Sequence, residues 1–309
     1  MATALALVLA AGGTTATAAG PPARCAFTSG THLLQIKIKR DRDAPGRTGT
    51  AYLGVRKRVV YLFAGVGGDA VECAGRSATT RNIEAVQVTA ARRLRSAELY
   101  VDQRRGVFAP GHTDEGDGSS EVEFDISLGR GLAYFLMTPG DDAVYARDLG
   151  TETIASLNAF EAPFDFDVTL RSGGLIFLGL GGDDLLSAEP PPPGPYDQYS
   201  PSPPGSGFGI GLIGGAGSDG LFGTPASDAL VGGGGDDLLI GGAGVDALNS
   251  SDRAVDHVNC GAGRDRLTSD RRDRTAECER GGGAGAAARA TRLPLGDPLD
   301  QLPLRLRRR

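Results

Sequence analysis

Apolar and polar residues alternate with a period of two along much of the first 187 residues. The alternation is clearest at residues 34–38, 122–128 and 164–170, where every second side chain is apolar. Such a period places successive side chains on opposite faces of a β-strand. Turn-forming sequences, such as those at 109–111, 138–140 and 171–174, separate the alternating segments. The pattern predicts an irregular β-rich domain over residues 21–187, built either as an irregular β-solenoid or as an antiparallel β-sandwich.

A nine-residue repeat replaces the alternation at residues 214–249. Its four consecutive units are GGAGSDGLF, GTPASDALV, GGGGDDLLI and GGAGVDALN, with Gly first, Asp sixth and Leu eighth in each unit. Glycines allow the first half of a unit to turn through positive φ. The last three residues are expected to form a short strand with its leucine pointing inward. Two units would then form one coil of 18 residues, with alternate units on opposite sides.

The sixth-position aspartates fall into two sets separated by one coil. Asp219 precedes Asp237 by 18 residues, and Asp228 precedes Asp246 by 18 residues. Stacked coils would bring each pair to about 4.8 Å, the spacing of neighbouring strands. Carboxylates at that distance repel one another unless a cation lies between them. Ca²⁺ suits the gap because it takes about 6 to 8 oxygen ligands. A flexible glycine-rich linker, the alternative, needs no Asp and Leu in fixed phase.

The repeat resembles the G-G-x-G-x-D-x-U-x pattern of the RTX calcium-binding β-roll proteins. The resemblance is strong over residues 214–267 and extends weakly back to GLGGDDLL at residues 179–186. It implies an all-β fold with a right-handed parallel β-roll, in which several Ca²⁺ ions lie between stacked turns. The ligands are expected to be aspartate side chains and glycine carbonyl groups. In this chain the implied calcium ligands are Asp184, Asp219, Asp228, Asp237, Asp246, Asp256, Asp265, Gly215, Gly217, Gly233, Gly235, Gly242 and Gly244.

The ends of the repeat are less regular. Residues 205–213 keep the phase but have Ile210 at the sixth position, so this coil is expected to pack without calcium. Residues 250–259 contain one extra residue. The next sixth position after Asp265 is Arg274, and residues 269–279 are predicted to form a charged cap. The predicted β-roll with its cap covers residues 208–279. A proline-rich loop or linker at 188–207 precedes it, and a disordered basic tail at 280–309 follows.

The four cysteines point to an oxidising compartment. Cys260 and Cys278 lie 18 residues apart, so one coil would stack them within the Cα range of a disulfide, and Cys25 would pair with Cys73. Residues 1–20 contain an apolar segment and an A-x-A site at 16–18, as in a signal peptide. These features predict a secreted, extracellular protein. No later apolar run is long enough for a transmembrane segment.

Residues suited to catalysis are few. The chain has only three histidines, in separate regions, and a net charge of −6, which gives no support for nucleic-acid binding. A G-x-G-x-x-A match at residues 65–70 lacks the helix that a dinucleotide site requires. We therefore expect a calcium-binding protein with a structural or adhesive role, whose partners include cell-surface glycans or proteins. The alternative is a calcium-dependent polysaccharide lyase or hydrolase with Asp165 and Asp167 beside Arg171, although a solvated strand face explains these two acids more simply.

Overall fold

The structure is a computed structural model that describes residues 23–40, 48–63, 70–75, 77–109, 111, 122–149, 151–157, 167–188 and 209–278. These residues form β-strands and irregular segments and contain no helix. The all-β class predicted from the sequence is therefore confirmed for the described part of the chain. The expected signal peptide, nearly all of the proline-rich segment and the basic tail lie outside the described residues. The chain divides into two compact units, residues 1–133 and 134–309, which we describe separately.

In the first unit, parallel pairing connects strands that are far apart in the sequence. Its strands are β1 (Ala23–Thr28), β2 (Leu33–Ile38), β3 (Thr48–Arg56), β4 (Val59–Phe63), β5 (Ala70–Glu72), β6 (Ala85–Ala90), β7 (Ser96–Asp102) and the start of β8 (Glu123–Leu136). Strands β2, β6 and β8 pair in parallel, and β3 pairs in parallel with β7. Antiparallel pairs join β1 to β2 and β3 to β4. The parallel pairings differ from those of the antiparallel sandwich considered above.

The alternating residues of the first unit form its core. Ile36 lies opposite Val88, which lies opposite Ile126, and each of the three side chains is at most 1% exposed. Burying one face of each strand explains the period of two in the sequence. A disulfide between Cys25 and Cys73 joins two segments of this unit. This pairing was predicted and is confirmed.

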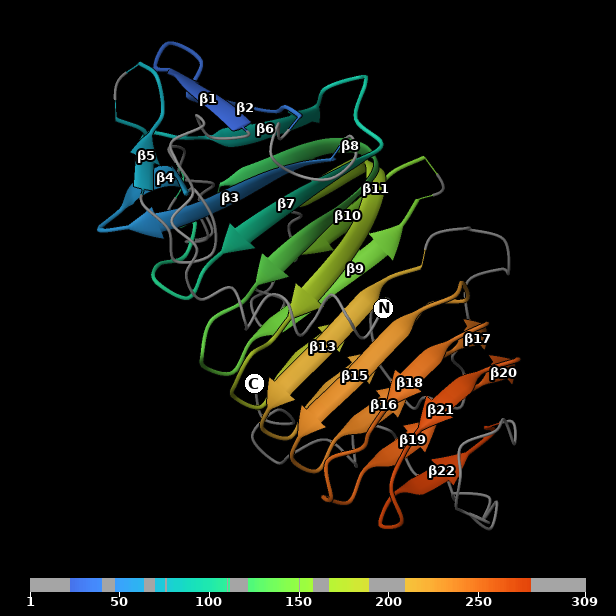
Figure 1. Cartoon of the computed structure of the whole chain (residues 1–309). Coiled ribbons are helices and arrows are strands. Elements are labelled where there is room, and N and C mark those ends of the chain that lie inside the picture. Colours follow the sequence, from blue (N-terminus) through green and yellow to red (C-terminus); the bar gives the residue numbers. More distant parts are fainter. Residues whose placement is uncertain are drawn as a thin grey trace, which may run out of the picture. The chain divides into compact units, whose positions relative to one another are not determined.

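The second unit contains two rows of parallel strands, between which the chain alternates. The strands are β9 (Ala143–Asp148), β10 (Thr153–Ser156), β11 (Val168–Leu178), β12 (Leu185–Ser187), β13 (Gly211–Ala216), β14 (Gly220–Phe222), β15 (Ala229–Gly234), β16 (Leu238–Ile240), β17 (Ala243–Gly244), β18 (Ala247–Asn249), β19 (His257–Asn259), β20 (Ala262–Gly263), β21 (Arg266–Thr268) and β22 (Arg274–Ala276). One row follows the order β11, β13, β15, β18 and β21. The other follows the order β9, β12, β14, β16, β19 and β22. Figure 1 shows β13, β15, β18 and β21 side by side.

The eighth-position leucines form a column within each row. Leu212, Leu230 and Leu248 are in register in the first of these rows, and Leu221 pairs with Leu239 in the other. All five are at most 2% exposed. Fully burying a leucine stabilises a fold by roughly 1.5–3 kcal/mol. These short strands, with one inward residue each, therefore obtain much of their stability from the two columns.

Both rows continue across the proline-rich segment. Strand β11 pairs in parallel with β13, and β12 pairs with β14, although residues 189–208 separate the two pairs of strands in the chain. The ladder therefore begins before the regular repeat. It also joins the weak GLGGDDLL segment, which contains the first residues of β12, to the strong nonapeptides.

Candidate metal centre

Aspartates from successive coils form two rows of hydrogen-bonded carboxylates. In each row the backbone N–H of one residue donates to Oδ1 of the aspartate in the next coil, over 2.8–3.0 Å for nearly every step. The first row contains Asp142, Asp184, Asp219, Asp237, Asp256 and Asp273, the last joined by a longer 3.4 Å bond. The second row begins at the N–H of Ile210 and contains Asp228, Asp246 and Asp265. Each aspartate lies at or beside the start of its strand.

Six of these aspartates have a buried carboxylate oxygen that receives no hydrogen bond. Oδ2 is buried and unpartnered in Asp184, Asp219, Asp237, Asp246, Asp256 and Asp265. The residues are between 0% and 7% exposed. A buried oxygen without a donor costs about 1–3 kcal/mol, and more when it is charged. Six such oxygens at equivalent positions are therefore a large, repeated deficit that a bound cation would remove.

The first glycine of each unit makes room for this oxygen. A Cβ atom added to Gly214 would overlap Asp219 Oδ2, and one added to Gly232 would overlap Asp237 Oδ2. In these units the glycine five residues before the aspartate is thus required by the carboxylate, whereas Ser251 and Cys260 occupy that position before Asp256 and Asp265. This contact explains why the first position and the sixth position of the repeat are linked.

Five of the six turns that precede the unpartnered carboxylates share a backbone conformation, whereas the turn before Asp256 has positive φ at Arg253 alone. In three nonapeptide turns, the second and fourth residues have positive φ: Gly215 and Gly217, Gly233 and Gly235, and Gly242 and Gly244. The turn before Asp184 has the same form, with Leu180 at φ 77° in the second position. Positive φ is rare for a bulky residue such as leucine. The stacked neighbours therefore impose this turn even where the sequence disfavours it.

Burial makes the negative charge of these carboxylates costly. It raises the pKa of Asp184 and of Asp237 to about 8, although each accepts one backbone N–H bond that lowers the pKa. Burial also raises the pKa of Asp246 and of Asp256 to about 7 and that of Asp219 to about 6. Neighbouring carboxylates raise these values further. A cation beside Oδ2 would favour the ionised form and counter both effects.

The donor set of the two rows suits a hard cation such as Ca²⁺, whose ligands are oxygens. Within the described ranges, no three histidine, cysteine, aspartate or glutamate side chains form a group that could hold a metal ion. A Ca²⁺ ion at these turns would need further oxygen ligands besides the carboxylates, and the main-chain carbonyl groups of the turns could supply them.

The structure brings together the aspartates that the sequence selected. Asp219 and Asp237 fall in one row and Asp228 and Asp246 in the other, as the 18-residue period predicted. Asp256 and Asp265 continue these rows after steps of 19 residues, because the unit at residues 250–259 contains one extra residue. Asp184 joins the first row, and Ile210 takes the sixth-position place in the second. The predicted glycines lie in the turns before these aspartates.

One predicted register is wrong. Arg274 was expected at the sixth position after Asp265, but it pairs with His257, the residue that follows Asp256. Asp273 therefore takes the aspartate position, where its Oδ2 accepts bonds from Ser250 Oγ and the N–H of Asp270. The last unit is one residue shorter than the period predicts. Strand pairing, and not residue counting, sets the register here.

Sequence analysis also missed Asp142. It precedes Asp184 by 42 residues, so no 18-residue period connects them. Pairing of β9 with β12 nevertheless places the Asp142 N–H 2.8 Å from Asp184 Oδ1. The only sequence signal was the short Gly-Asp-Asp motif at 140–142, which repeats the Gly-Asp-Asp at 182–184.

The acids considered for the lyase alternative are not arranged as expected. Asp167 is 3% exposed and accepts a 2.6 Å bond from the backbone N–H of Leu157, so it is not on a solvated strand face. Arg171 forms a 2.8 Å ion pair with Glu152. Asp165 lies outside the described residues, as do residues 65–69 of the dinucleotide-like segment.

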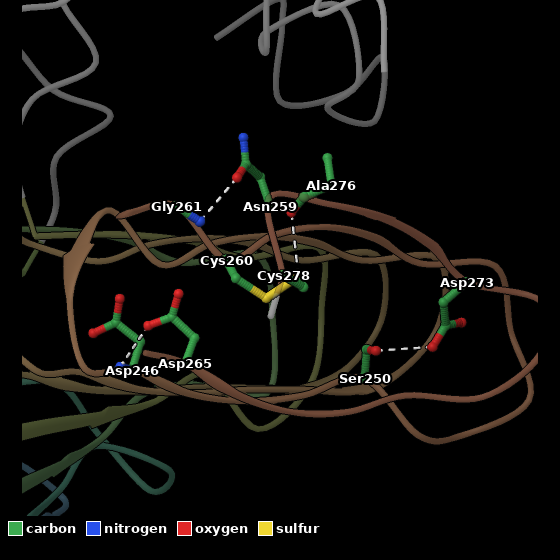
Figure 2. Close-up of a disulfide and its surroundings, with 9 residues drawn as sticks. All are labelled: Asp246, Ser250, Asn259, Cys260, Gly261, Asp265, Asp273, Ala276 and Cys278. Atoms are coloured by element: carbon green, nitrogen blue, oxygen red, sulfur yellow. Dashed lines mark hydrogen bonds between the residues drawn. A yellow bond between two sulfur atoms is a disulfide. The ribbon is translucent and has the colours of Figure 1, made fainter. Parts of the chain in front are cut away.

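A disulfide joins the residues that follow β19 and β22, the last two strands of their row. Cys260 and Cys278 are bonded with their Cα atoms 4.9 Å apart, as predicted. Figure 2 shows Asp246 and Asp265 on one side of this disulfide and Asp273 with Ser250 on the other. Two disulfides fit an oxidising environment, and the described residues leave no cysteine free.

In the part of the chain that the structure describes, no helix is long and apolar enough to cross a membrane. No family model, curated protein or solved structure matches this chain.

Proposed function

We propose that this protein is a secreted calcium-binding protein whose C-terminal part folds as an RTX-type β-roll around several Ca²⁺ ions. The observation that carries the proposal is the set of six buried Oδ2 atoms without a hydrogen-bond donor. They recur immediately before a strand, and five of the six follow turns that contain positive-φ glycine. Bound calcium would supply the positive charge that these oxygens lack.

Three features of the chain would together hold the ion: the bond to Oδ1, the turn glycines and the leucine columns. The backbone N–H bond to Oδ1 fixes the orientation of each carboxylate and leaves Oδ2 free to coordinate. The glycines at the second and fourth positions orient the peptide groups of the turn. The buried leucine columns hold successive turns at the strand spacing, so each aspartate lies beside the next coil's turn.

The oxygen ligands and the irregular geometry of the site favour calcium over the other common divalent ions. Mg²⁺ demands near-octahedral geometry and keeps several waters, whereas Ca²⁺ accepts irregular sets of carboxylate and carbonyl oxygens. Zinc prefers nitrogen and sulfur ligands. No histidine or cysteine is a member of either row, and all four cysteines are in disulfides.

The biological role that fits this chemistry is structural or adhesive. Extracellular calcium modules bind with Kd of about 10⁻⁴–10⁻³ M, so such a roll would be folded outside a cell and unstable where calcium is scarce. The two disulfides support the same compartment. Cell-surface glycans or proteins are the proposed partners. The lyase or hydrolase alternative gains no support from Asp167, which is buried and hydrogen-bonded to Leu157.

Calcium titration of the purified mature chain tests the proposal. We expect the far-ultraviolet circular dichroism of β-structure and the calorimetric midpoint both to rise on adding Ca²⁺ to chelator-treated protein. A site at a free calcium concentration 100 times Kd adds about 2.7 kcal/mol to the free energy of unfolding. Magnesium at equal ionic strength is the control and should give a much smaller change. Equal β content and equal midpoints in chelator and in millimolar calcium would refute the proposal.

A further inference from the structure

Two turns of the second unit satisfy their aspartate without any ion. They have the sequences T-P-G-D-D at residues 138–142 and T-P-A-S-D at residues 224–228. In the second, Oδ2 of Asp228 accepts the backbone N–H of Thr224 at 2.5 Å and the Thr224 hydroxyl at 2.9 Å. In the first, Oδ2 of Asp142 accepts the N–H of Thr138 at 2.9 Å and its hydroxyl at 3.1 Å.

The two turns share the rest of their hydrogen bonding as well. The threonine Oγ1 accepts a backbone N–H two residues on, from Gly140 at 3.2 Å in one turn and from Ala226 at 2.9 Å in the other. No residue of either turn has positive φ. We call these two the closed turns, and we call the turns that precede the six unpartnered aspartates the open turns.

Closed and open turns differ at the atom that a cation would need. In an open turn Oδ2 has no donor, whereas in a closed turn it has two. A cation at that place would face the positive end of the threonine N–H dipole and would have to displace the hydroxyl proton. The buried Oδ2 atoms of Asp228 and Asp142 thus already receive their hydrogen bonds from the chain itself.

The closed turns occupy equivalent places in the two rows. Asp142 is the first aspartate of the first row, and Asp228 is the first aspartate of the second. At the other end of the first row, Ser250 Oγ donates to Oδ2 of Asp273, so a side-chain hydroxyl also satisfies that carboxylate. In the first row the unpartnered oxygens lie between these two ends, and in the second row they follow Asp228.

We propose that the Thr-Pro turns at 138–142 and 224–228 are cation-excluding caps, which confine calcium to the open turns of Asp184, Asp219, Asp237 and Asp256 in one row and of Asp246 and Asp265 in the other. The inference rests on the proposed function and removes Asp228 from the expected ligands. It also gives a sequence rule for this chain. A T-P-x-x-D turn holds the first aspartate of each row, and G-x-x-G-x-D turns hold Asp184, Asp219, Asp237 and Asp246. The turns of Asp256 and Asp265 depart from the glycine pattern, with the sequences S-D-R-A-V-D and C-G-A-G-R-D.

The chain contains its own template for testing the rule. Replacing Thr224→Gly, Pro225→Ala and Ala226→Gly converts residues 223–228 from GTPASD to GGAGSD, the sequence of residues 214–219. This variant should bind at least one more Ca²⁺ per chain than the unaltered protein, measured by equilibrium dialysis and elemental analysis. The control is Thr224→Ser, which keeps both the N–H and the hydroxyl and should leave the number unchanged.

The reverse exchange tests the same rule in the other direction. Replacing Gly215→Thr, Ala216→Pro and Gly217→Ala should remove at least one bound Ca²⁺, with disulfide mapping used to verify the fold. If the unaltered chain binds calcium and the forward exchange adds none, the cap proposal is wrong while the proposed function stands. If the unaltered chain binds no calcium, the proposed function itself fails.

Discussion

The two oxygens of each open-turn aspartate have separate tasks. Oδ1 accepts the backbone N–H of the preceding coil, and Oδ2 remains buried and without a donor. The first bond fixes where the second oxygen lies, so the site is oriented before any ion arrives. Pre-arranged ligands of this kind reduce the ordering cost of binding.

Asp237 and Asp228 should therefore respond differently to replacement by alanine. Asp237 lies between Asp219 and Asp256 in its row, and its Oδ2 is unpartnered. Asp237→Ala should lose bound calcium and about 2.7 kcal/mol of calcium-dependent stability for each site lost at 100 times Kd. Asp228→Ala removes the bonds from Thr224 and Ile210 but should leave the number of bound ions unchanged. Isothermal titration of both variants checks this, and equal losses of sites would contradict it.

Gly232 and Gly234 form a matched pair for the first position of the repeat. A Cβ on Gly232 would overlap Asp237 Oδ2, whereas one on exposed Gly234 would meet no atom nearer than 3.9 Å. Neither glycine has positive φ, so backbone strain does not separate them. Gly232→Ala should weaken calcium affinity at least tenfold, and Gly234→Ala should change it less than twofold. Similar affinities for the two variants would show that the first glycine is not needed by the carboxylate.

At the scale of the elements, short strands are held by their neighbours. Strands β14 and β16 are only three residues long, and they bury one leucine (Leu221) and two leucines (Leu238 and Leu239), respectively. Each of these strands makes its backbone hydrogen bonds to strands in the adjacent coils, so a single isolated coil would not keep them. Such stacked repeats depend on nearest-neighbour contacts, and their terminal coils are the weakest.

The disulfide of the terminal coils compensates for this weakness. It joins Cys260 to Cys278 across 18 residues, a loop for which chain entropy predicts about 3 kcal/mol. Replacing both cysteines by serine should lower the denaturation midpoint of the calcium-loaded protein and raise the calcium needed for folding. The matched control replaces Cys25 and Cys73, which lie in the first unit. If the control shifts the calcium-dependent transition as much as the Cys260 and Cys278 variant does, the terminal disulfide has no special role in that transition.

At the scale of the whole molecule, the buried carboxylates make stability depend on pH and calcium together. The folded protein raises the pKa of Asp184 and of Asp237 to about 8, chiefly by burial, whereas an unfolded aspartate titrates near 3.9. Between these values the folded state binds more protons than the unfolded state. Stability without calcium must therefore fall as the pH rises through this window.

We expect the melting temperature in chelator to be higher at pH 5 than at pH 8. Each carboxyl that is protonated in the folded state and ionised in the unfolded state lowers the free energy of unfolding by up to about 1.4 kcal/mol for each pH unit of increase. In millimolar calcium the trend should weaken or reverse, because protons compete with the ion for the same oxygens. Calorimetry at constant ionic strength measures both series. A midpoint in chelator that rises steadily from pH 5 to pH 8 would contradict the assignment of these carboxyls as buried and unpartnered.

The sequence by itself determined the local chemistry of the repeat. A phase of nine with Gly, Asp and Leu at fixed positions predicted the two aspartate sets and the buried Leu230 and Leu239. The 18-residue spacing also predicted the bond between Cys260 and Cys278. These inferences succeeded because equivalent positions of successive coils lie in register. Residues separated by one 18-residue period are therefore neighbours in the structure.

Only the tertiary structure decided which residues stand at the ends of the rows. Asp142 and Asp184 belong to the first row although 42 residues separate them, and Asp273 belongs there in place of Arg274. Insertions and deletions between strands leave the strand pairing intact but break the 18-residue period. Counting residues along the sequence therefore does not identify these positions. The sequence also did not predict that Thr224 is the hydrogen-bond partner of Asp228. A threonine in place of a repeat glycine suggested only a poorer calcium-binding turn. Only its N–H and hydroxyl bonds show that the carboxylate is already satisfied.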